Sequence, residues 1–506
     1  MLTLRILAGV ALTSWVWLAL ARGMYWRTNI RLPLAVDPTG TPWPSVAIIV
    51  PARDEVDVLP LTLSTLVAQD YPGRKRVILV DDNSTDGTAA FLADRWPDIT
   101  VIGPGEPPAG WAGKLWALRA GIAAADGATI DAATADGVET DRAGIDVATA
   151  DGAGTDSAGP VVATADGAET DSAGSDAATA DGAETDNAEN DRAGSVEATA
   201  DGAENDRAGT NTATIDSVMT EAATTDTAAR HQDDSFDYLL FTDADIAHES
   251  DSLTLLVRAA EANQLDLVSQ MARLRVRTGW ERLIVPAFVY FFALLYPFRW
   301  SNKVEARTAA AAGGCSLVRR TALVRAGGLD VIRDAVIDDV ALARAIKRAG
   351  GRTFLGLADH VDSIRPYPEL GSLWQMVARS AFAQLHRSLT LLVGTVVGLA
   401  LVFWVPPACL VIGAATVDVP TLLLGAAGYA LMTALYVPML RYYRLPWALA
   451  LVLPFTATLY LGMTVDSAVQ HFRGRGAAWK GRTYSGRQSV IGARRAAAAN
   501  DQRERP

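Results

Sequence analysis

Acidic pairs follow two segments of the chain that have the composition of buried strands. Asp81-Asp82 follows the apolar run RVILV, and Asp243-Ala-Asp245 follows YLLFT. In an extended chain the i, i+2 spacing of Asp243 and Asp245 turns both side chains to one face. Two carboxylates on one face are suitable ligands for Mg²⁺ or Mn²⁺, which would bridge the phosphate oxygens of a diphosphate. We therefore expect a metal site at Asp243 and Asp245, although Asp-x-Asp by itself also occurs in ordinary acidic turns.

The segments around these acids predict the elements that position them. Residues 45–52 (SVAIIVPA) and 76–84 (RVILVDDNS) have the pattern of buried strands, and residues 57–69 between them have that of a helix. Alternating strands and helices predict an α/β fold with a doubly wound, mostly parallel sheet. Ligands of such sheets bind at the carboxyl ends of the strands, which is where the acids fall. We place this domain at residues 44–125 and 235–387.

The composition excludes several classes of protein. Half of the 506 residues are apolar and 20% are charged, which indicates a combination of membrane and soluble segments. The two cysteines, Cys315 and Cys409, exclude a disulfide scaffold and a CxxC zinc site. The five histidines form no HExxH motif, which argues against a helix-borne zinc protease.

Residues 126–234 form an acidic low-complexity insertion between the two pieces of the domain. The unit ATADG starts at residues 133, 148, 163, 178 and 198. Because the segment has no aromatic residue and little large apolar surface, we predict that it is disordered. Its Asp-Gly pairs also suggest calcium-binding repeats, but the glycine-rich nonapeptide that such repeats require is absent.

The charge of the chain is unevenly distributed. The net charge is −12 for the whole chain and −22 for residues 126–235, so the remainder carries +10. A basic body suits anionic lipid headgroups or phosphorylated substrates. The sequence contains no recognisable nucleic-acid-binding module, so we expect membrane and phosphate partners and no nucleic acid.

The N-terminal segment, residues 1–25, is a candidate membrane anchor. Its apolar run at 6–21 contains no charge, and basic residues are more frequent after the run than before it. The positive-inside rule then keeps the following domain in the cytoplasm. The alternative is a secretory signal peptide, because Ala19-Leu20-Ala21 fits a cleavage site.

The C-terminal region, residues 388–466, predicts about three membrane spans, near 389–416, 420–440 and 446–465. Together with the anchor, three spans would place the basic tail, residues 467–506, outside the cytoplasm, against the positive-inside rule. Either the run broken by Pro406-Pro407 crosses twice, or one segment is re-entrant. A further apolar stretch, residues 283–298, contains two prolines, and it fits either an interfacial segment or a buried core helix.

Several motifs together resemble a known family. They are PARDE (51–55), VDDNSTDGT (80–88), GKLWAL (113–118), FTDAD (241–245) and IDDVALARAIKRAG (337–350). In this order they resemble family-2 glycosyltransferases of the GT-A fold. Longer stretches, including TAAAAGGCSLVRR and RGAAWKGRTY, are similar to the hopene-associated glycosyltransferases.

The resemblance implies a role for each matching residue. The residues that would line the nucleotide pocket or contact the donor diphosphate are Pro51, Arg53, Glu55, Asp81, Asp82, Lys114 and Asp243. Among them, Asp82 would hydrogen-bond the uracil or ribose, with Asp81 as the alternative. Asp243 and Asp245 would hold the metal.

The pair Asp338-Asp339 takes the place of the family's Glu-Asp pair, and Asp339 would be the general base. Alternatively, Asp339 is the N-cap of the helix that follows it, since aspartate is a favoured N-cap residue. Both roles are compatible.

One motif departs from the pattern of the processive members of the family. Their Q-x-x-R-W motif corresponds here to Gln375-Met-Val-Ala-Arg379-Ser380, which lacks the tryptophan and has one more residue between Gln and Arg. The departure argues against polymer synthesis and leaves Arg379 as a candidate phosphate contact.

The resemblance thus implies a membrane-bound, inverting, non-processive glycosyltransferase that uses Mg²⁺ or Mn²⁺. Its donor would be a nucleotide sugar, with a UDP-sugar favoured, and its acceptor a lipid, for which a hopanoid, another polyprenoid and a glycerolipid are the alternatives. The enzyme would be a multi-pass protein of the inner (plasma) membrane with a cytoplasmic catalytic domain. The alternatives are a catalytically silent membrane scaffold and a nucleotidyltransferase, although the latter would need a glycine-rich phosphate loop that the chain lacks after its first strand.

Overall fold

The computed structural model describes residues 1–33, 42–96, 99–127, 235–473, 478–479 and 482–483. These residues belong to one compact unit. The predicted insertion at 126–234 lies outside the described residues except for its first two positions, and so does most of the predicted tail at 467–506.

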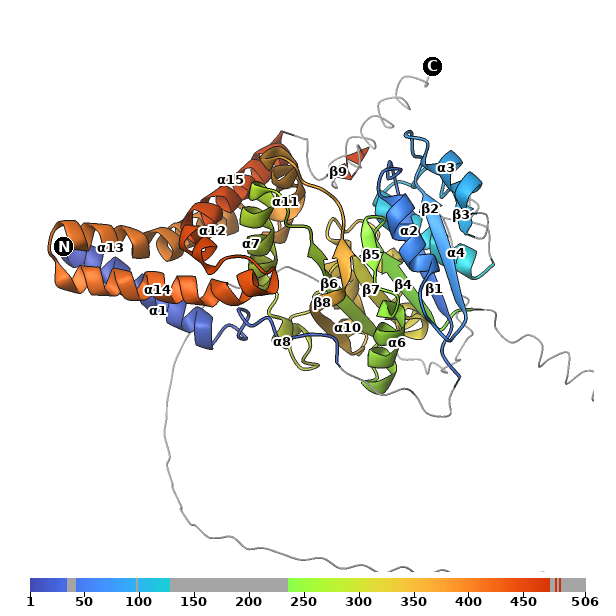
Figure 1. Cartoon of the computed structure of the whole chain (residues 1–506), viewed down its shortest axis with the longest axis horizontal. Helices are drawn as coiled ribbons and strands as arrows, with labels where there is room; N and C mark the ends of the chain where they lie inside the picture. The colour runs from blue at the N-terminus through green and yellow to red at the C-terminus, as the bar shows by residue number, and fades with distance from the viewer. Residues whose placement is uncertain (34–41, 97–98, 128–234, 474–477, 480–481, 484–506) are drawn as a thin grey trace, which may run out of the picture. The chain divides into compact units, whose positions relative to one another are not determined.

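A mixed sheet forms the centre of the α/β part (Figure 1). Within the described residues it has eight strands in the order β3-β2-β1-β4-β7-β6-β8-β5. The strands are β1 (Val46–Ala52), β2 (Lys75–Asp81), β3 (Thr100–Ile102), β4 (Tyr238–Thr242), β5 (Ile246–His248), β6 (Leu267–Leu274), β7 (Cys315–Arg319) and β8 (Thr353–Ser363).

Parallel pairings predominate, as predicted, and β7 is the main exception. The pairs β1–β2, β2–β3, β1–β4 and β6–β8 are parallel, whereas β7 runs antiparallel to both β4 and β6. The reversal pairs Cys315 at the start of β7 with Thr242 at the end of β4. The loop that precedes β7 therefore lies beside Asp243, whose N–H donates to the carbonyl of Gly314 at 3.4 Å.

Helices cover both faces of the sheet, and strand alternation decides which face each residue meets. Val46, Ile48 and Val50 of β1 pack with α2 (Leu59–Val67) and α6 (Ser252–Ala262). Ala47 and Ile49 face the opposite side and pack with α4 (Gly113–Ala125) and α10 (Asp338–Arg348). Because β1 is buried on both faces, its sequence is a continuous run of apolar residues.

The remaining elements are shorter or peripheral to the sheet. They are α3 (Thr88–Arg95), α8 (Phe298–Ser301), α9 (Arg320–Arg325), the 3₁₀ turn η2 (Asp330–Ile332) and the strand pair β9 (Ala478–Trp479) and β10 (Arg482–Thr483).

The apolar stretch at 283–298 falls largely in α7 (Gly279–Leu295), which is a buried helix. Thr278 and Glu281 form a capping box at its start, which satisfies backbone N–H groups of the first turn. Ile284, Val285 and Tyr290 are fully buried in the apolar cluster that also contains residues of the C-terminal helices. The buried-helix alternative therefore describes this segment, rather than the interfacial one.

The predicted membrane spans appear as long apolar helices. They are α1 (Leu2–Leu20), the continuous run of α12 (Leu389–Leu399), η3 (Ala400–Trp404) and α13 (Val405–Ala415), α14 (Val419–Tyr442), and η4 (Trp447–Val452) with α15 (Leu453–Phe472). Pro406-Pro407 does not divide the run into two spans. Because proline lacks an N–H donor, the run instead loosens into the π-helical turn η3 just before it.

The last apolar segment, η4 with α15, turns back toward the sheet. Beyond the end of α14, η4 runs back along that helix, and Tyr429 Oη donates to the carbonyl of Leu451 at 2.6 Å. α15 then returns toward the sheet, where Phe382 N donates to Ser467 Oγ at 3.0 Å (Figure 1). Both ends of the segment formed by η4 and α15 thus lie near the sheet, an arrangement that fits the re-entrant alternative, while by length and composition the segment is a candidate span.

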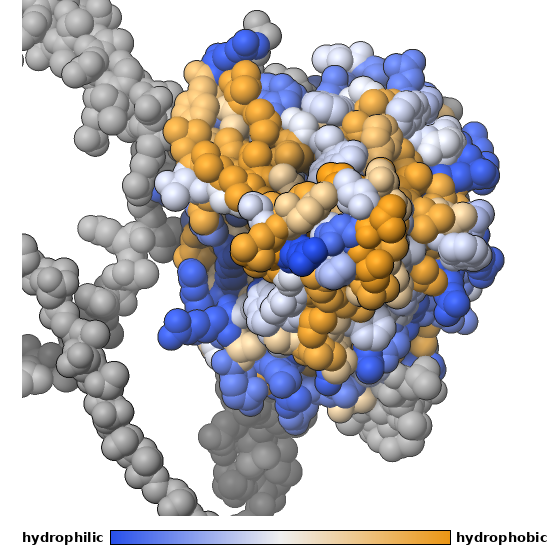
Figure 2. Space-filling model, turned by 90° about the vertical axis from the view of Figure 1, so that its left-hand side faces the viewer, coloured by the Kyte–Doolittle hydropathy of each residue, from blue (hydrophilic) through white to orange (hydrophobic). Residues whose placement is uncertain are grey.

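The N-terminal helix is packed into this bundle. Trp15 is fully buried and donates to the carbonyl of Val402 at 2.8 Å, and Arg5 pairs with Asp418 in the turn between α13 and α14. These contacts connect α1 to the C-terminal apolar helices. Figure 2 looks onto this end of the bundle and shows a largely apolar surface, to which Leu2, Ile6, Val411 and Leu423 contribute. The predicted fold class, an α/β domain with apolar helices at both ends, is confirmed.

Candidate active site

A cavity of about 980 Å³ lies at the carboxyl ends of β1 and β4. It brings together eight residues singled out from the sequence: Pro51, Glu55, Lys114, Asp243, Asp245, Asp338, Asp339 and Arg379. They lie at the carboxyl ends of β1 and β4, at the starts of α4 and α10, and in α11 (Leu370–Gln384). The remaining three, Arg53, Asp81 and Asp82, do not line the cavity.

Lys114 at the start of α4 links two of the carboxylates. Its Nζ lies 2.7 Å from Oδ1 of Asp243 and 3.2 Å from Oδ2 of Asp338. Burial alone would lower the pKa of Lys114, but the two aspartates outweigh this effect and raise it, so the amine stays charged. For Asp243, burial and the neighbouring Asp245 and Asp338 raise the pKa, while Lys114 opposes them. The site therefore carries more negative charge than its lysine neutralises.

Asp339 lies in the first turn of α10, beside the loop that precedes β7. Its Oδ2 accepts a 2.8 Å hydrogen bond from the N–H of Gly313, and its Oδ1 accepts one of 2.7 Å from Val340. Burial and the adjacent Asp338 raise the pKa of Asp339 to about 7. Ile337, and not Asp339, is the N-cap of α10, so the capping alternative was wrong.

The close approach of Lys114 and Asp339 leaves little room for a side chain at position 313. A Cβ on this residue would lie 3.3 Å from Nζ of Lys114 and 3.5 Å from Oδ2 of Asp339. A larger side chain would therefore occupy the space between the lysine and the carboxylate.

Arg365 was not anticipated from the sequence. Its Nη2 lies 2.7 and 2.8 Å from the two carboxylate oxygens of Glu55, and its Nε lies 3.2 Å from Oδ2 of Asp245. Oδ2 of Asp245 also accepts a 2.9 Å hydrogen bond from Ser363. The available signal was positional, because Arg365 lies two residues after the end of β8.

Arg53, Asp81 and Asp82 form a layer beside the cavity. Asp82 is fully buried, and its Oδ2 lies 3.4 Å from Nη1 of Arg53. Asp81 accepts a hydrogen bond from the N–H of Ser84 at 3.2 Å, which stabilises the turn after β2. In this structure these residues support the loops around the nucleotide pocket predicted from the sequence.

The acidic residues of the cavity fit a divalent cation. Asp243 and Asp245 offer oxygen ligands of the kind that Mg²⁺ and Mn²⁺ prefer. Burial and, after it, the neighbouring Asp245 and Asp338 raise the pKa of Asp243, and a bound cation would favour its ionised carboxylate. Glu249, Asp251 and His360 form a second group of possible ligands, but they lie outside the cavity lining, and His360 Nδ1 is already 2.8 Å from Glu249 Oε2.

The cavity extends from the acids to the helices at the membrane side. Phe288 and Phe292 of α7 and Met376 of α11 line it and pack against the apolar cluster shared with the spans. On the same side it is lined by Arg387 after α11 and by His471 near the end of α15. One wall of the cavity is therefore apolar and continuous with the candidate membrane helices.

Comparison with known protein families identifies glycosyltransferase sequence in both pieces of the α/β part. The model of glycosyl transferase family 21 matches residues 224–489, more than half of the chain. The model of glycosyl transferase family 2 matches residues 47–143. The resemblance seen in the motifs is thus confirmed at the level of a family-2 glycosyltransferase domain.

Two curated proteins match short stretches of the chain. The beta-monoglucosyldiacylglycerol synthase of Synechocystis sp. is 36% identical over 107 residues, 20% of this chain and 22% of that protein. An N-acetylglucosaminyltransferase of Mesorhizobium japonicum is 38% identical over 63 residues, 12% of this chain and 15% of that protein. The chain thus spans about a fifth or less of the length of these relatives.

Among solved structures, a mannosyltransferase of Pyrobaculum calidifontis in complex with GDP-Man and Mn²⁺ is similar to the chain at 18% identity. The match covers 93% of this chain and 99% of that one, with a TM-score of 0.42.

Proposed function

This chain belongs to glycosyl transferase family 21, and we propose that it transfers a sugar from a nucleotide sugar to a membrane lipid, with inversion at the anomeric carbon. One observation carries the proposal. A single cavity contains a carboxylate suited to be a base, a carboxylate pair suited to a cation, and an apolar wall that continues into the candidate spans.

Asp339 is the proposed general base. The acceptor hydroxyl oxygen attacks the anomeric carbon, its proton moves to a carboxylate oxygen of Asp339, and the bond to the diphosphate oxygen breaks. A pKa of about 7 supports this role, since a base works best when its pKa lies near the working pH. The N–H of Gly313 holds the carboxylate in place.

Lys114, Asp243 and Asp245 form the proposed donor side. Asp243 and Asp245 would hold Mg²⁺ or Mn²⁺, which when bound neutralises charge on the leaving diphosphate. Lys114 supplies a fixed positive charge beside the same group, and Pro51 and Glu55 border the nucleotide pocket. The sequence resemblance favours a UDP-sugar as the donor, with Arg379 as a further donor contact, whereas Arg53, Asp81 and Asp82, which do not line the cavity, would support the loops around the nucleotide.

A lipid acceptor is supported by the apolar wall at Phe288, Phe292 and Met376. The sequence similarity to beta-monoglucosyldiacylglycerol synthase, although it spans a fifth of that protein, supports the same class of acceptor. The resemblance to hopene-associated enzymes suggests a hopanoid-related lipid. We place the enzyme in the inner membrane, with the catalytic domain, residues 44–125 and 235–387, on the cytoplasmic side.

Nucleoside diphosphate release tests this function. The full chain, reconstituted in vesicles with Mg²⁺ or Mn²⁺, is offered UDP- and GDP-sugars together with a hopanoid, a polyprenol or diacylglycerol. We expect release that requires both a donor and a lipid acceptor, with a glycolipid product of inverted anomeric configuration. A wild-type protein that binds nucleotide sugars but transfers to none of these lipids would contradict the proposed acceptor class.

A further inference from the structure

Arg365 connects two carboxylates that have separate roles in the proposed site. Glu55 follows β1 and borders the nucleotide pocket, whereas Asp245 follows β4 and belongs to the proposed metal site. One guanidinium contacts both, at 2.7 and 2.8 Å through Nη2 and at 3.2 Å through Nε. The metal and nucleotide sides of the cavity are therefore linked by a single side chain.

The surrounding backbone holds Arg365 firmly in this position. Ile364 N donates to the carbonyl of Asp245 at 2.9 Å, which ties the end of β8 to the metal side. Tyr367 N donates to Oε1 of the fully buried Glu281 at 2.8 Å, which ties the following residues to α7. The side chain of Arg365 is 28% exposed and lines the cavity, so a ligand in the cavity can reach its guanidinium.

This position has opposite consequences for a cation and for a diphosphate. An arginine is always charged in proteins, and its charge repels a divalent cation that approaches Asp245. The same planar guanidinium matches the oxygens of a phosphate group. Arg365 thus disfavours the metal when the cavity holds no donor and favours the diphosphate when a donor enters.

Building on the proposed function, we propose that Arg365 is a donor-binding residue that couples metal binding to nucleotide binding. Without donor it stays on Asp245 and weakens cation binding there. With donor it contacts an oxygen of the diphosphate and leaves Asp245 available to the cation. Such coupling is reciprocal. The bound nucleotide must therefore increase the affinity for the metal by the same factor as the bound metal increases the affinity for the nucleotide.

Binding of Mn²⁺ and of UDP or GDP, measured separately and together, tests the proposal without any turnover. Mn²⁺ is followed by electron paramagnetic resonance and the nucleotide by calorimetry, on the full chain in detergent. For Arg365→Gln we expect Mn²⁺ alone to bind roughly tenfold more tightly, because a neighbouring positive charge is removed. Metal-free nucleotide should bind roughly tenfold more weakly, and the mutual enhancement should shrink.

Two further variants make the result specific. Arg365→Lys keeps the positive charge but removes the planar guanidinium group. This variant should therefore still bind Mn²⁺ weakly, as the wild type does, and should lose part of its affinity for the nucleotide. Arg273→Gln removes a similarly exposed arginine that pairs with Asp362 at 2.8 and 2.9 Å but does not line the cavity, and it should change neither affinity.

A merely structural role would lower both affinities in Arg365→Gln, together with the melting temperature, and would overturn the proposal. If Arg365→Gln left both affinities unchanged, the proposal would also be overturned, and Arg365 would only form ion pairs with Glu55 and Asp245. Failure of the proposed function has a different signature, namely a wild-type protein that binds Mn²⁺ and nucleotide with mutual enhancement but transfers no sugar.

Discussion

The backbone N–H of Gly313 donates a 2.8 Å hydrogen bond to Oδ2 of Asp339. The two residues belong to different elements, the loop before β7 and the first turn of α10. The bond orients a carboxylate whose pKa is raised to about 7 by burial and by Asp338. At neutral pH a substantial part of Asp339 is therefore ionised and able to accept a proton.

Replacing the base should remove turnover but not donor binding. We expect Asp339→Asn to lower kcat by roughly 10²–10⁴-fold, because the amide cannot take the acceptor proton. Nucleotide affinity, measured by calorimetry, should stay within a few-fold of that of the wild type. Asp359→Asn, which removes a half-exposed carboxylate paired with Arg31, serves as the control and should be fully active. Full turnover of Asp339→Asn would exclude this base.

The pH dependence of turnover should report the pKa of Asp339. The base is active when ionised, so kcat/KM should rise with pH through about 7 and level off above it. Asp338 raises this pKa through its negative charge. Asp338→Asn should therefore lower the pKa and shift the rising limb to lower pH. If the rise in kcat/KM of Asp338→Asn stayed at the same pH or moved to higher pH, the pH profile would not report the pKa of Asp339.

Glu281 should be important for stability. Its fully buried carboxylate accepts hydrogen bonds from the N–H groups of Arg277, Thr278 and Tyr367 at 2.7–2.8 Å. Glu281→Ala leaves these donors without their acceptor, which should cost about 3 kcal/mol. We expect the melting temperature in detergent to fall by about 5 °C or more. Glu249→Ala, which removes a carboxylate that is 57% exposed, should leave it nearly unchanged.

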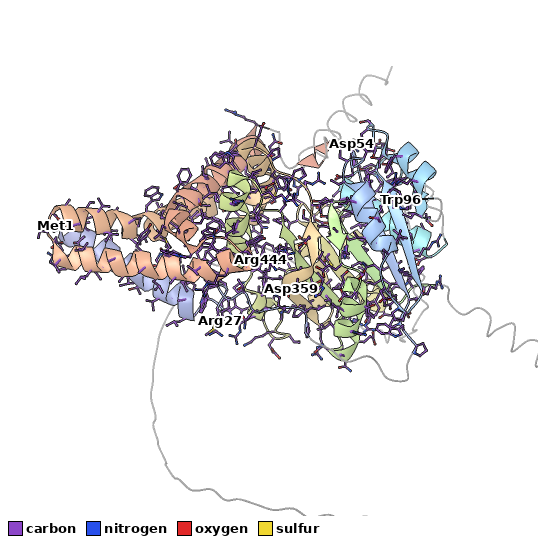
Figure 3. All side chains as sticks on the ribbon, in the orientation of Figure 1. Met1, Arg27, Asp54, Trp96, Asp359 and Arg444 are labelled. Carbon is purple, nitrogen blue, oxygen red and sulfur yellow. The ribbon has the colours of Figure 1, made fainter. Side chains whose placement is uncertain are left out.

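We predict that η4 and α15 are re-entrant and do not cross the membrane, and cysteine labelling can test this topology. Figure 3 shows Met1 at the end of α1 that is remote from the sheet and Arg444 beside the sheet. A single cysteine at Val417, in the turn that contacts Arg5 through Asp418, should be labelled by an impermeant maleimide from outside the cell. Cysteines at Arg444 and Arg473 should be labelled only in inverted vesicles. The native Cys315 and Cys409 are buried and give a low background. Labelling of position 473 from outside would show that α15 crosses the membrane.

Deletion of residues 128–232 should leave glycosyl transfer largely intact. The two flanks meet at Arg320, whose Nη2 lies 2.7 Å from Oδ2 of Asp126 and whose N–H donates to the carbonyl of Asp237 at 2.9 Å. A short loop can therefore close the gap between α4 and β4 without a change of topology. The measurement is donor-dependent release of nucleoside diphosphate by the purified variant. A variant that folds and inserts normally but has lost transfer would show that the segment belongs to the active enzyme.

The strands, the spans and most of the acids of the site could be predicted from the sequence. Buried strands such as β1 and β4 are continuous apolar runs, and the positions that follow them lie at the carboxyl edge of the sheet. The spans are recognisable because a bilayer requires about 20 apolar residues in succession. These are local properties, which depend on neighbouring residues only.

The tertiary structure decided the features that depend on residues far apart in the chain. Arg365 reaches Glu55 across 310 positions, and its role depends on the end of β8 being held beside β4. The full burial of Asp82 and the return of α15 likewise depend on packing against distant elements. Hydropathy alone allows α15 to cross the membrane, whereas in the structure its contact with α11 brings its end toward the sheet. The sequence by itself therefore determined which groups could do chemistry, and only the fold decided which of them meet, because pair energies depend on distances that no local pattern encodes.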